Sequence, residues 1–300
     1  MHNPHFDYLD SLSSKAAPGP DGIPAKMLKK GKNTICRHIL NEIFKTSFCQ
    51  GEIPSLLKKA FVIPIFKCGS KVQPSNYRPV SLTSHLMKTF ERILVRGLVA
   101  YLDVKGLLNK SQHGARSGRS TLSQLLLHKL LEALENRDNI DAIYLDFAKA
   151  FDKVDHNLLL RKLKRMGIKG KLRMWFQNFL KERTQQVLVD GKLSSTFTLI
   201  SGIPQGSVLG PILFLIFISD STEGLNSDVF IYVDDTKILK RIRNVEEVLE
   251  LQLDLFKLHH WGQNNGMVYN DDKFVAIRHR QNNKKRRHKL LLWRNGGGNW

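Results

Sequence analysis

The sequence predicts an α+β fold, in which short strands lead into acidic residues and alternate with amphipathic helices. The apolar runs at 140–146 and 229–233 are short, rich in Ile, Val and aromatic residues, and lead directly into aspartate, which predicts strands. Apolar residues at helical spacing over 35–48 and 245–256 predict helices. With 300 residues and 42% hydrophobic content, the chain can form one large domain or two ordinary ones around a sizeable core.

The first half of the chain is predicted to contain a loop, two helices and a strand. Pro and Gly residues make 16–24 a structured loop, and the apolar spacing of 35–48 makes the next segment a helix. The run at 60–66 predicts a strand with Pro64 at an edge or a bulge. Leucines between 122 and 134 form a stripe too short for sustained heptads, which favours a core-facing helix.

The second half is predicted to continue with helix, hairpins and a final helix. An amphipathic stretch covers 156–180, and Asp190-Gly191 lies at the centre of 186–200, which is typical of a hairpin. The strand at 229–233 is followed, after Asp234-Asp235, by a further apolar run at 237–239. The helix that begins at Val245 can be capped by Asn244 and Glu247.

The charge of the chain indicates a polyanionic partner, with nucleic acid as the first candidate. The net charge is +20, with 47 Lys and Arg against 27 Asp and Glu. Residues 56–120 hold twelve basic and two acidic residues, a net +10, interleaved with apolar residues and prolines, which favours contact with phosphates. Residues 278–300 hold eight basic and no acidic residues and include three consecutive glycines, so we expect a mobile tail, with a solvated surface and phosphate contact as equal alternatives.

The cellular location is predicted from what the sequence lacks. The longest apolar stretch, 208–218, is about half of the roughly 20 residues that a bilayer-spanning helix needs, so no membrane partner is expected. The first residues carry neither a basic nor an apolar signal segment, and the three cysteines form no CxxC pair. We expect an intracellular protein of the nucleus and/or cytoplasm that is not secreted.

Aspartates at two strand ends are the candidate chemical site. Asp146 and the pair Asp234-Asp235 follow apolar runs, and a Gly- and Pro-rich loop lies between them at 201–207. Adjacent buried carboxylates repel unless a cation compensates them, so the pattern favours a divalent metal site over an exposed hairpin tip.

Three segments carry a resemblance to a known family. Residues 143–152, 201–211 and 232–236 read IYLDFAKAFD, SGIPQGSVLGP and YVDDT. In this order and spacing they resemble the reverse transcriptases of non-LTR (LINE-type) retrotransposons. The resemblance extends over about residues 15–275, through segments at 18–22, 62–67, 76–82 and 270–273.

The resemblance implies a right-hand polymerase fold of fingers and palm, with an antiparallel palm sheet flanked by helices. It implies an N-terminal extension over 1–55, basic fingers over 56–135, a palm over 136–277 and the tail over 278–300, with part of 156–185 packing with the fingers as an alternative. We expect a fragment that lacks the upstream endonuclease and most of the thumb.

The implied activity is RNA-directed DNA synthesis, in which dNTPs are added to a DNA primer on an RNA template. Asp146, Asp234 and Asp235 would be the catalytic residues and the ligands of two Mg²⁺ ions, with Mn²⁺ as an alternative. Such phosphoryl transfer needs charge neutralisation and alignment more than covalent chemistry.

Further roles follow from position in the matched segments. Phe151 resembles the steric gate beneath the incoming sugar, with a plain core aromatic as the alternative. Gln205 and Gly206 match the loop that packs on the nascent base pair. The dNTP-binding cations implied by the resemblance are Lys67, Arg78 and Lys273. The candidate nucleic-acid-binding cations are Lys58, Lys59, Lys71, Arg116 and Arg119.

Two other functions remain open. A catalytically weak remnant would bind nucleic acid through its basic face alone, and a metal-dependent phosphohydrolase or nuclease would also use clustered aspartates. A kinase or P-loop enzyme is disfavoured because the sequence has neither GxxxxGK[ST] nor GxGxxG.

Overall fold

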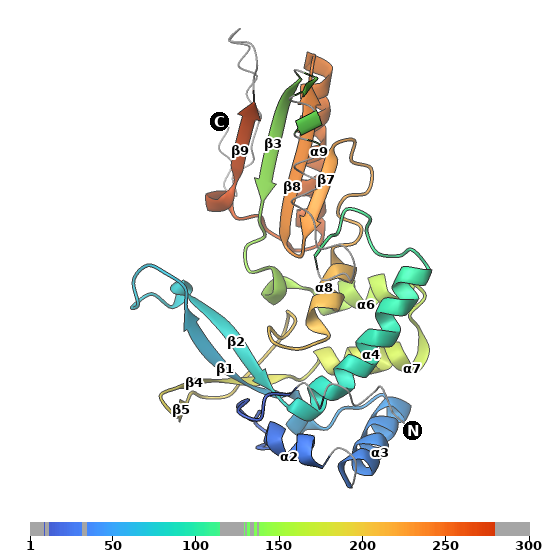
Figure 1. Ribbon diagram of the computed structural model, residues 1–300, viewed down its shortest axis with the longest axis vertical. Helices are drawn as coiled ribbons and strands as arrows, with labels where there is room; N and C mark the ends of the chain where they lie inside the picture. The colour runs from blue at the N-terminus through green and yellow to red at the C-terminus, as the bar shows by residue number, and fades with distance from the viewer. Residues whose placement is uncertain are drawn as a thin grey trace. The chain divides into compact units, whose positions relative to one another are not determined.

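The chain folds into two compact units, each of which combines a β-sheet with helices (Figure 1). Unit 1 comprises Met1–Lys105 and Asp155–Ile216, and unit 2 comprises Gly106–Val154 and Phe217–Trp300. The predicted α+β class is confirmed. This structure is a computed structural model that describes residues 9, 12–31, 35–114, 129, 131–132, 135–136 and 138–279.

Unit 1 is built on a five-stranded sheet in the order β2-β1-β4-β5, with β6 paired to β4. Strands β1 and β2 are antiparallel, whereas β1 and β4 are parallel. The elements of this unit are α2 (Ala25–Lys30), α3 (Ile35–Gln50), η2 (Ser55–Lys58), β1 (Lys59–Phe66), η3 (Pro74–Asn76), β2 (Tyr77–Thr83), α4 (His85–Val104), α6 (His156–Arg165), α7 (Gly170–Leu180), β4 (Thr184–Val189), β5 (Lys192–Leu193), β6 (Phe197–Thr198) and α8 (Gly210–Phe217) except for its last residue.

Aromatic side chains join the helices of unit 1. The rings of Phe44 in α3 and Phe90 in α4 stack at 4.5 Å, and Phe90 meets Trp175 of α7 edge-on at 4.9 Å. Trp175 is fully buried and also stacks on Phe179 at 5.6 Å. Such pairs add specific geometry to the burial of large apolar surfaces, so they fix α4 against α3 and α7.

Unit 2 is built on a four-stranded antiparallel sheet in the order β7-β8-β3-β9, and helix α9 packs against β8 (Figure 1). The sheet core includes Ile140, Ala142, Phe230 and Leu239. The elements of this unit are β3 (Asn139–Leu145), η4 (Ala150–Lys153), β7 (Asp228–Tyr232), β8 (Asp235–Ile242), α9 (Val245–Asn264), η5 (Asp271–Lys273) and β9 (Val275–His279).

Most local predictions are confirmed. Strand β1, helix α3, the β4–β5 hairpin and the strands β3, β7 and β8 lie where the sequence predicts them. Asp190 and Gly191 form the β4–β5 turn with φ of 50° and 75°. The side chain of Asn244 caps α9 by accepting a hydrogen bond from the Glu247 amide at 2.9 Å.

Other segments differ from expectation. The stretch at 156–180 forms two helices, α6 and α7, because Gly167 and Gly170 adopt φ of 85° and 61°, which a helix interior excludes. Strand β2 and helix α4 had no counterpart in the sequence prediction. Most of the leucine stripe at 122–134 and nearly all of the tail at 278–300 lie outside the described residues.

The two contact units divide the chain differently from the predicted extension, fingers and palm. Residues 155–216 group with the N-terminal residues, which includes the segment at 156–185 for which packing with the fingers was an alternative. The fingers and palm boundaries therefore stay a prediction. Within the described part of the chain, no helix is both long and apolar enough to cross a bilayer.

Candidate active site

The antiparallel register of unit 2 brings the predicted aspartates together. Strand β3 pairs with β8 up to Leu145 opposite Thr236, so the next residues on the two strands are Asp146 and Asp235. Tyr232 pairs with Asp235 across the β7–β8 hairpin, which leaves Val233 and Asp234 as its two-residue turn. Three carboxylates thus come from two adjacent strand ends.

The carboxylates share one electrostatic environment. Burial raises the pKa of Asp234, and the neighbouring charges of Asp146 and Asp235 raise it further. The Asp146 side chain is 11% exposed and accepts a hydrogen bond at Oδ2 from Lys273 Nζ. This bond, together with the other two carboxylates, raises the pKa of Lys273. The structure therefore brings Asp146, Asp234, Asp235 and Lys273 into one region, and their catalytic and binding roles stay predictions.

The donor set suits a hard cation. Carboxylate oxygens are the ligands that Mg²⁺ takes, and it usually binds one or two of them together with waters and substrate phosphates. Within the described residues, no group of three or more His, Cys, Asp or Glu side chains is placed so that it could hold a metal ion. The three aspartates would therefore hold Mg²⁺ only together with waters and substrate phosphates.

The loop after Asp146 is fixed by main-chain and aromatic contacts. The carbonyl of Asp146 accepts from the Asn270 amide at 2.8 Å, and Phe147 stacks on Tyr269 at 4.5 Å. Lys149 has a φ of 54° and precedes the short helix η4, which carries Phe151. Phe151 is half-buried whereas Phe147 is buried, so Phe147 is the core aromatic of this loop.

The loop of Gln205 and Gly206 lies in unit 1, against β2. The Ser81 amide donates to the carbonyl of Gln205 at 2.8 Å. Gly206 has a φ of 114°, and a Cβ at this position would lie 2.5 Å from the Ser81 carbonyl oxygen. Glycine is therefore required both by the backbone conformation and by the close approach of β2.

Glu91 of α4 holds the other end of this loop, and the sequence prediction missed it. Its Oε2 accepts hydrogen bonds from the amides of Val208 at 2.6 Å and Leu209 at 2.9 Å, just before α8 begins. Full burial raises the pKa of Glu91, and Arg183 lies near enough to oppose that shift. The sequence signal for Glu91 was that it is one of only two acidic residues in the basic segment 56–120.

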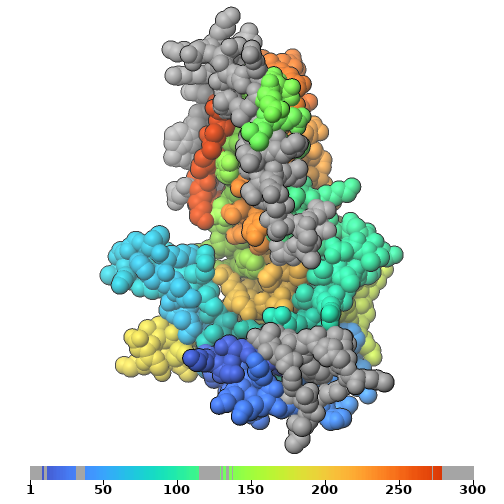
Figure 2. All heavy atoms as spheres, in the orientation of Figure 1, coloured from blue at the N-terminus to red at the C-terminus, as the bar shows by residue number. Residues whose placement is uncertain are grey.

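The predicted dNTP-binding cations Lys67 and Arg78 lie on the β1–β2 hairpin of unit 1. Both are exposed, Lys67 directly after β1 and Arg78 opposite Ile65 of β1. The Lys67 amide donates to the Asn76 carbonyl at 2.9 Å, which closes the hairpin. Figure 2 shows the hairpin, in cyan, projecting from the surface. The side chains of Lys67 and Arg78 are therefore accessible to a polyanion in solution.

The five candidate nucleic-acid-binding cations fall into three groups. Lys59 and Lys71 are exposed, and Lys71 Nζ lies 5.8 Å from the centroid of the Phe66 ring. Lys58 is different, because its side chain is 5% exposed and lies 3.6 Å from Glu182 in an ion pair. Arg116 and Arg119 lie outside the described residues.

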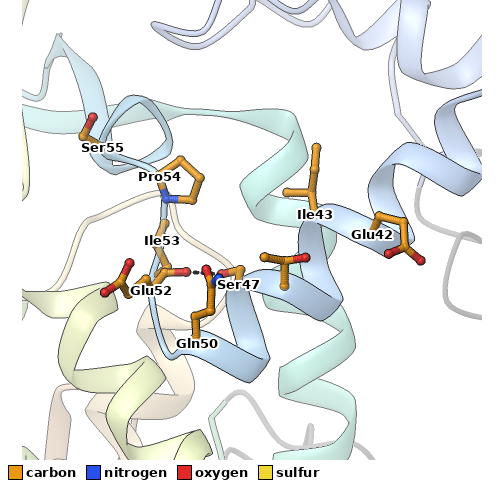
Figure 3. Close-up of a pocket in the computed structure, with 9 residues that line it drawn as sticks. Glu42, Ile43, Ser47, Gln50, Glu52, Ile53, Pro54 and Ser55 are labelled. Carbon is orange, nitrogen blue, oxygen red and sulfur yellow. Dashed lines mark hydrogen bonds between the residues drawn. The ribbon is translucent and has the colours of Figure 1, made fainter.

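A shallow cavity of about 560 Å³ in unit 1 is separate from these residues. It lies between the second half of α3 and the segment that leads into η2, where Ser47 donates a hydrogen bond to the carbonyl of Glu52 (Figure 3). None of the predicted site residues lines this cavity.

Comparison with known proteins gives one family. The family model described as reverse transcriptase (RNA-dependent DNA polymerase) matches residues 65–290. The chain is 35% identical over 283 residues to the RNA-directed DNA polymerase from mobile element jockey of Drosophila melanogaster, covering 90% of the chain and 30% of the relative. It is 31% identical over 224 residues to a probable RNA-directed DNA polymerase from transposon BS of the same species, covering 71% of the chain and 24% of the relative.

A more distant relative is also similar in sequence, and one solved structure is similar in fold. The chain is 27% identical over 281 residues to a Pol polyprotein from a type-1 R2 retrotransposable element of Popillia japonica, covering 87% of the chain and 37% of the relative. Apo telomerase from Candida tropicalis, truncated from its C-terminal domain, superposes with a TM-score of 0.56 at 14% identity over 82% of this chain and 56% of that chain. The chain spans between 24% and 30% of the length of the first two relatives.

Proposed function

Because the chain belongs to the reverse transcriptase family, among the RNA-directed DNA polymerases of mobile elements, we propose that it adds deoxynucleotides to a DNA primer on an RNA template. One observation carries the proposal. The register of β3 and β8 places Asp146 beside Asp235, with Asp234 in the adjoining turn.

Reverse transcriptases as a family use divalent metal ions. We assign Asp146, Asp234 and Asp235 as the residues that would hold two Mg²⁺ ions, with Mn²⁺ as an alternative. The ions would supply charge neutralisation for the attacking hydroxyl and the leaving pyrophosphate. The raised pKa of Asp234, caused by burial and by two nearby carboxylates, supports a place for added positive charge.

The chain's own side chains are assigned the binding and orienting steps. Lys67 and Arg78 bind the triphosphate, because both are exposed cations on one hairpin. The loop of Gln205 and Gly206, held against β2, is assigned to pack on the nascent base pair, and half-buried Phe151 is assigned to exclude a 2′-hydroxyl. Lys273, bonded to Asp146, is positioned near the site of pyrophosphate release.

Nucleic acid binds through phosphate contacts in this proposal. Exposed cations such as Lys59 and Lys71 support contact with template and primer phosphates, whereas buried Lys58 is excluded from this set. We place the protein in the nucleus and/or cytoplasm, where nucleic acid templates occur.

Primer extension tests the proposal. The chain is incubated with an RNA template, an annealed DNA primer, Mg²⁺ and dNTPs, beside the Asp234→Asn variant. Extension by the wild type alone supports polymerisation. Binding without extension favours the remnant that only binds nucleic acid, and Mg²⁺-dependent cleavage of the template favours the nuclease.

A further inference from the structure

A segment just after α4 runs alongside β7 in unit 2. The Ile231 amide donates to the Ser111 carbonyl at 2.8 Å, and the His113 amide donates to the Ile231 carbonyl at 2.8 Å. Gln112 and Ile231 form a parallel bridge. Residues 109–114 therefore extend the edge of the sheet that ends in the Val233-Asp234 turn.

The side chain of Gln112 reaches from this segment to the turn. Gln112 is 2% exposed, and its Oε1 accepts hydrogen bonds from the amides of Gly114 at 2.9 Å and Val233 at 3.2 Å. Its Nε2 donates to the carbonyl of Val233 at 3.4 Å. One amide side chain thus engages both main-chain polar groups of Val233, the residue directly before Asp234.

The backbone of Val233 needs such support. Its φ of 60° lies in the left-handed region, which is an outlier for a β-branched residue. Gly114 packs against the same backbone, since a Cβ at residue 114 would lie 2.7 Å from Val233 N. The side-chain amide of Gln112 therefore bonds to the turn, and Gly114 packs so closely against it that a larger residue would not fit.

We propose that Gln112 is a positioning residue that holds the strained Val233 backbone and thereby aims the Asp234 carboxylate toward Asp146 and Asp235. The inference rests on the proposed function of these carboxylates. The alternative is a brace that stabilises the sheet without affecting the site.

The experiment compares Gln112→Met with Asn109→Ala in the full chain. Methionine keeps the length of the side chain but removes both polar groups. Asn109 anchors the same segment through bonds to the Ser219 carbonyl at 3.0 Å and Thr222 Oγ1 at 2.6 Å, without contact to the turn in those bonds. Primer extension gives kcat and the KM for dNTP, titration calorimetry with Mn²⁺ gives metal affinity, and urea unfolding gives stability.

A positioning role predicts that Gln112→Met lowers kcat about tenfold or more with the KM changed less than about threefold, and weakens Mn²⁺ binding about fivefold. Asn109→Ala should lower stability while kcat and the Mn²⁺ affinity stay within about twofold of the wild type, because the bonds of Asn109 to Ser219 and Thr222 do not involve the turn. Equal effects of the two variants on kcat and on Mn²⁺ affinity would overturn the proposal.

Two further variants keep the test decisive. Gly114→Ala should reproduce the losses of Gln112→Met with the Gln112 amide intact, because its Cβ displaces Val233. Val233→Gly removes the strain, so Gln112→Met should cost less than about threefold in kcat in that background. If the effects of Val233→Gly and Gln112→Met on kcat are additive, the inference is contradicted.

If the wild type extends no primer, the proposed function fails, whereas the Mn²⁺ affinities still decide the role of Gln112.

Discussion

Lys273 Nζ donates a hydrogen bond to Asp146 Oδ2 across 127 residues of sequence. The Lys273 side chain is 62% exposed, whereas that of Asp146 is 11% exposed, so a flexible surface cation reaches a largely buried anion. The ammonium offsets part of the repulsion among the three carboxylates. A divalent cation bound by Asp146 would compete for the same oxygen.

Replacing Lys273 with Met should therefore lower the stability of the metal-free protein and increase the stabilisation that added Mg²⁺ provides. We expect a loss of about 0.5 kcal/mol in the free energy of unfolding, because the cation is solvent-screened. The rise in melting temperature on adding Mg²⁺ should be larger than in the wild type. Thermal unfolding with and without Mg²⁺ measures both, and Lys273→Arg, which keeps the charge, serves as the control. An unchanged response to Mg²⁺ would show that the lysine does not compensate this site.

Asp234→Asn should abolish nucleotide incorporation and stabilise the metal-free fold. Removing a metal ligand is expected to lower the rate by about a hundredfold or more. The pKa of Asp234 is raised by burial, so its protonated form is favoured in the folded state. The stability that the wild type has below the unfolded pKa of about 3.8 is lost as the pH rises through the folded pKa.

The Asp234→Asn variant lacks this loss, so its urea midpoint should exceed that of the wild type at pH 7 without metal, and the difference should vanish below about pH 3.8. Asp190→Asn at the exposed β4–β5 turn is the matched control for removing one negative charge. A midpoint no higher than that of the wild type, or a rate within about threefold, contradicts the assignment.

The sequence predicted the strands and the aspartates because their signals are local. Apolar runs lead directly into Asp146 and Asp234, and the antiparallel pairing of β8 with both β3 and β7 brings the carboxylates together. Helix α4 was not predicted, although it is amphipathic and carries Lys88, Arg92 and Arg96 along its length.

Long-range contacts had no such signal. Gln112 meets Val233 across 121 residues, and Glu91 meets Val208 across 117, with no periodicity that links either pair. Lys58 stands beside Lys59 in the sequence, yet only Lys59 is exposed. The pairing of Lys58 with Glu182 depends on the parallel contact of β1 with β4, which the sequence does not specify.

Phe151→Val should admit ribonucleotides more readily. The half-buried ring of Phe151 is assigned to exclude the 2′-hydroxyl, so its removal should raise the ratio of kcat/KM for rNTP to that for dNTP about tenfold or more. Phe147→Leu in the same loop is the control, because Phe147 stacks on Tyr269 and should affect stability alone. An unchanged ratio in the Phe151 variant would leave that residue as a core aromatic.

Glu91→Ala should destabilise unit 1 through the loop that carries Gln205. The change removes the acceptor of the Val208 and Leu209 amides and leaves buried Arg183 without its compensating charge, a loss of about 3 kcal/mol or more. Glu91→Ala with Arg183→Met should cost less than the sum of the single changes, because no isolated charge remains. Urea unfolding of the four proteins gives the coupling, and strict additivity would mean that the two side chains do not interact.

Salt dependence of binding should separate the exposed cations from the buried one. Each phosphate neutralised by Lys or Arg contributes roughly −0.7 to −0.9 to the slope of log affinity against log salt. Lys71→Gln and Lys59→Gln should each reduce the slope for an RNA/DNA duplex by about 1, since both side chains are open to solvent. Lys58→Met should leave the slope unchanged and alter stability instead, because its side chain is buried and paired with Glu182. Fluorescence titrations at several salt concentrations measure the slopes. A slope that falls with Lys58 but not with Lys71 would place the phosphates away from the β1–β2 hairpin and remove the electrostatic support for its role in template binding.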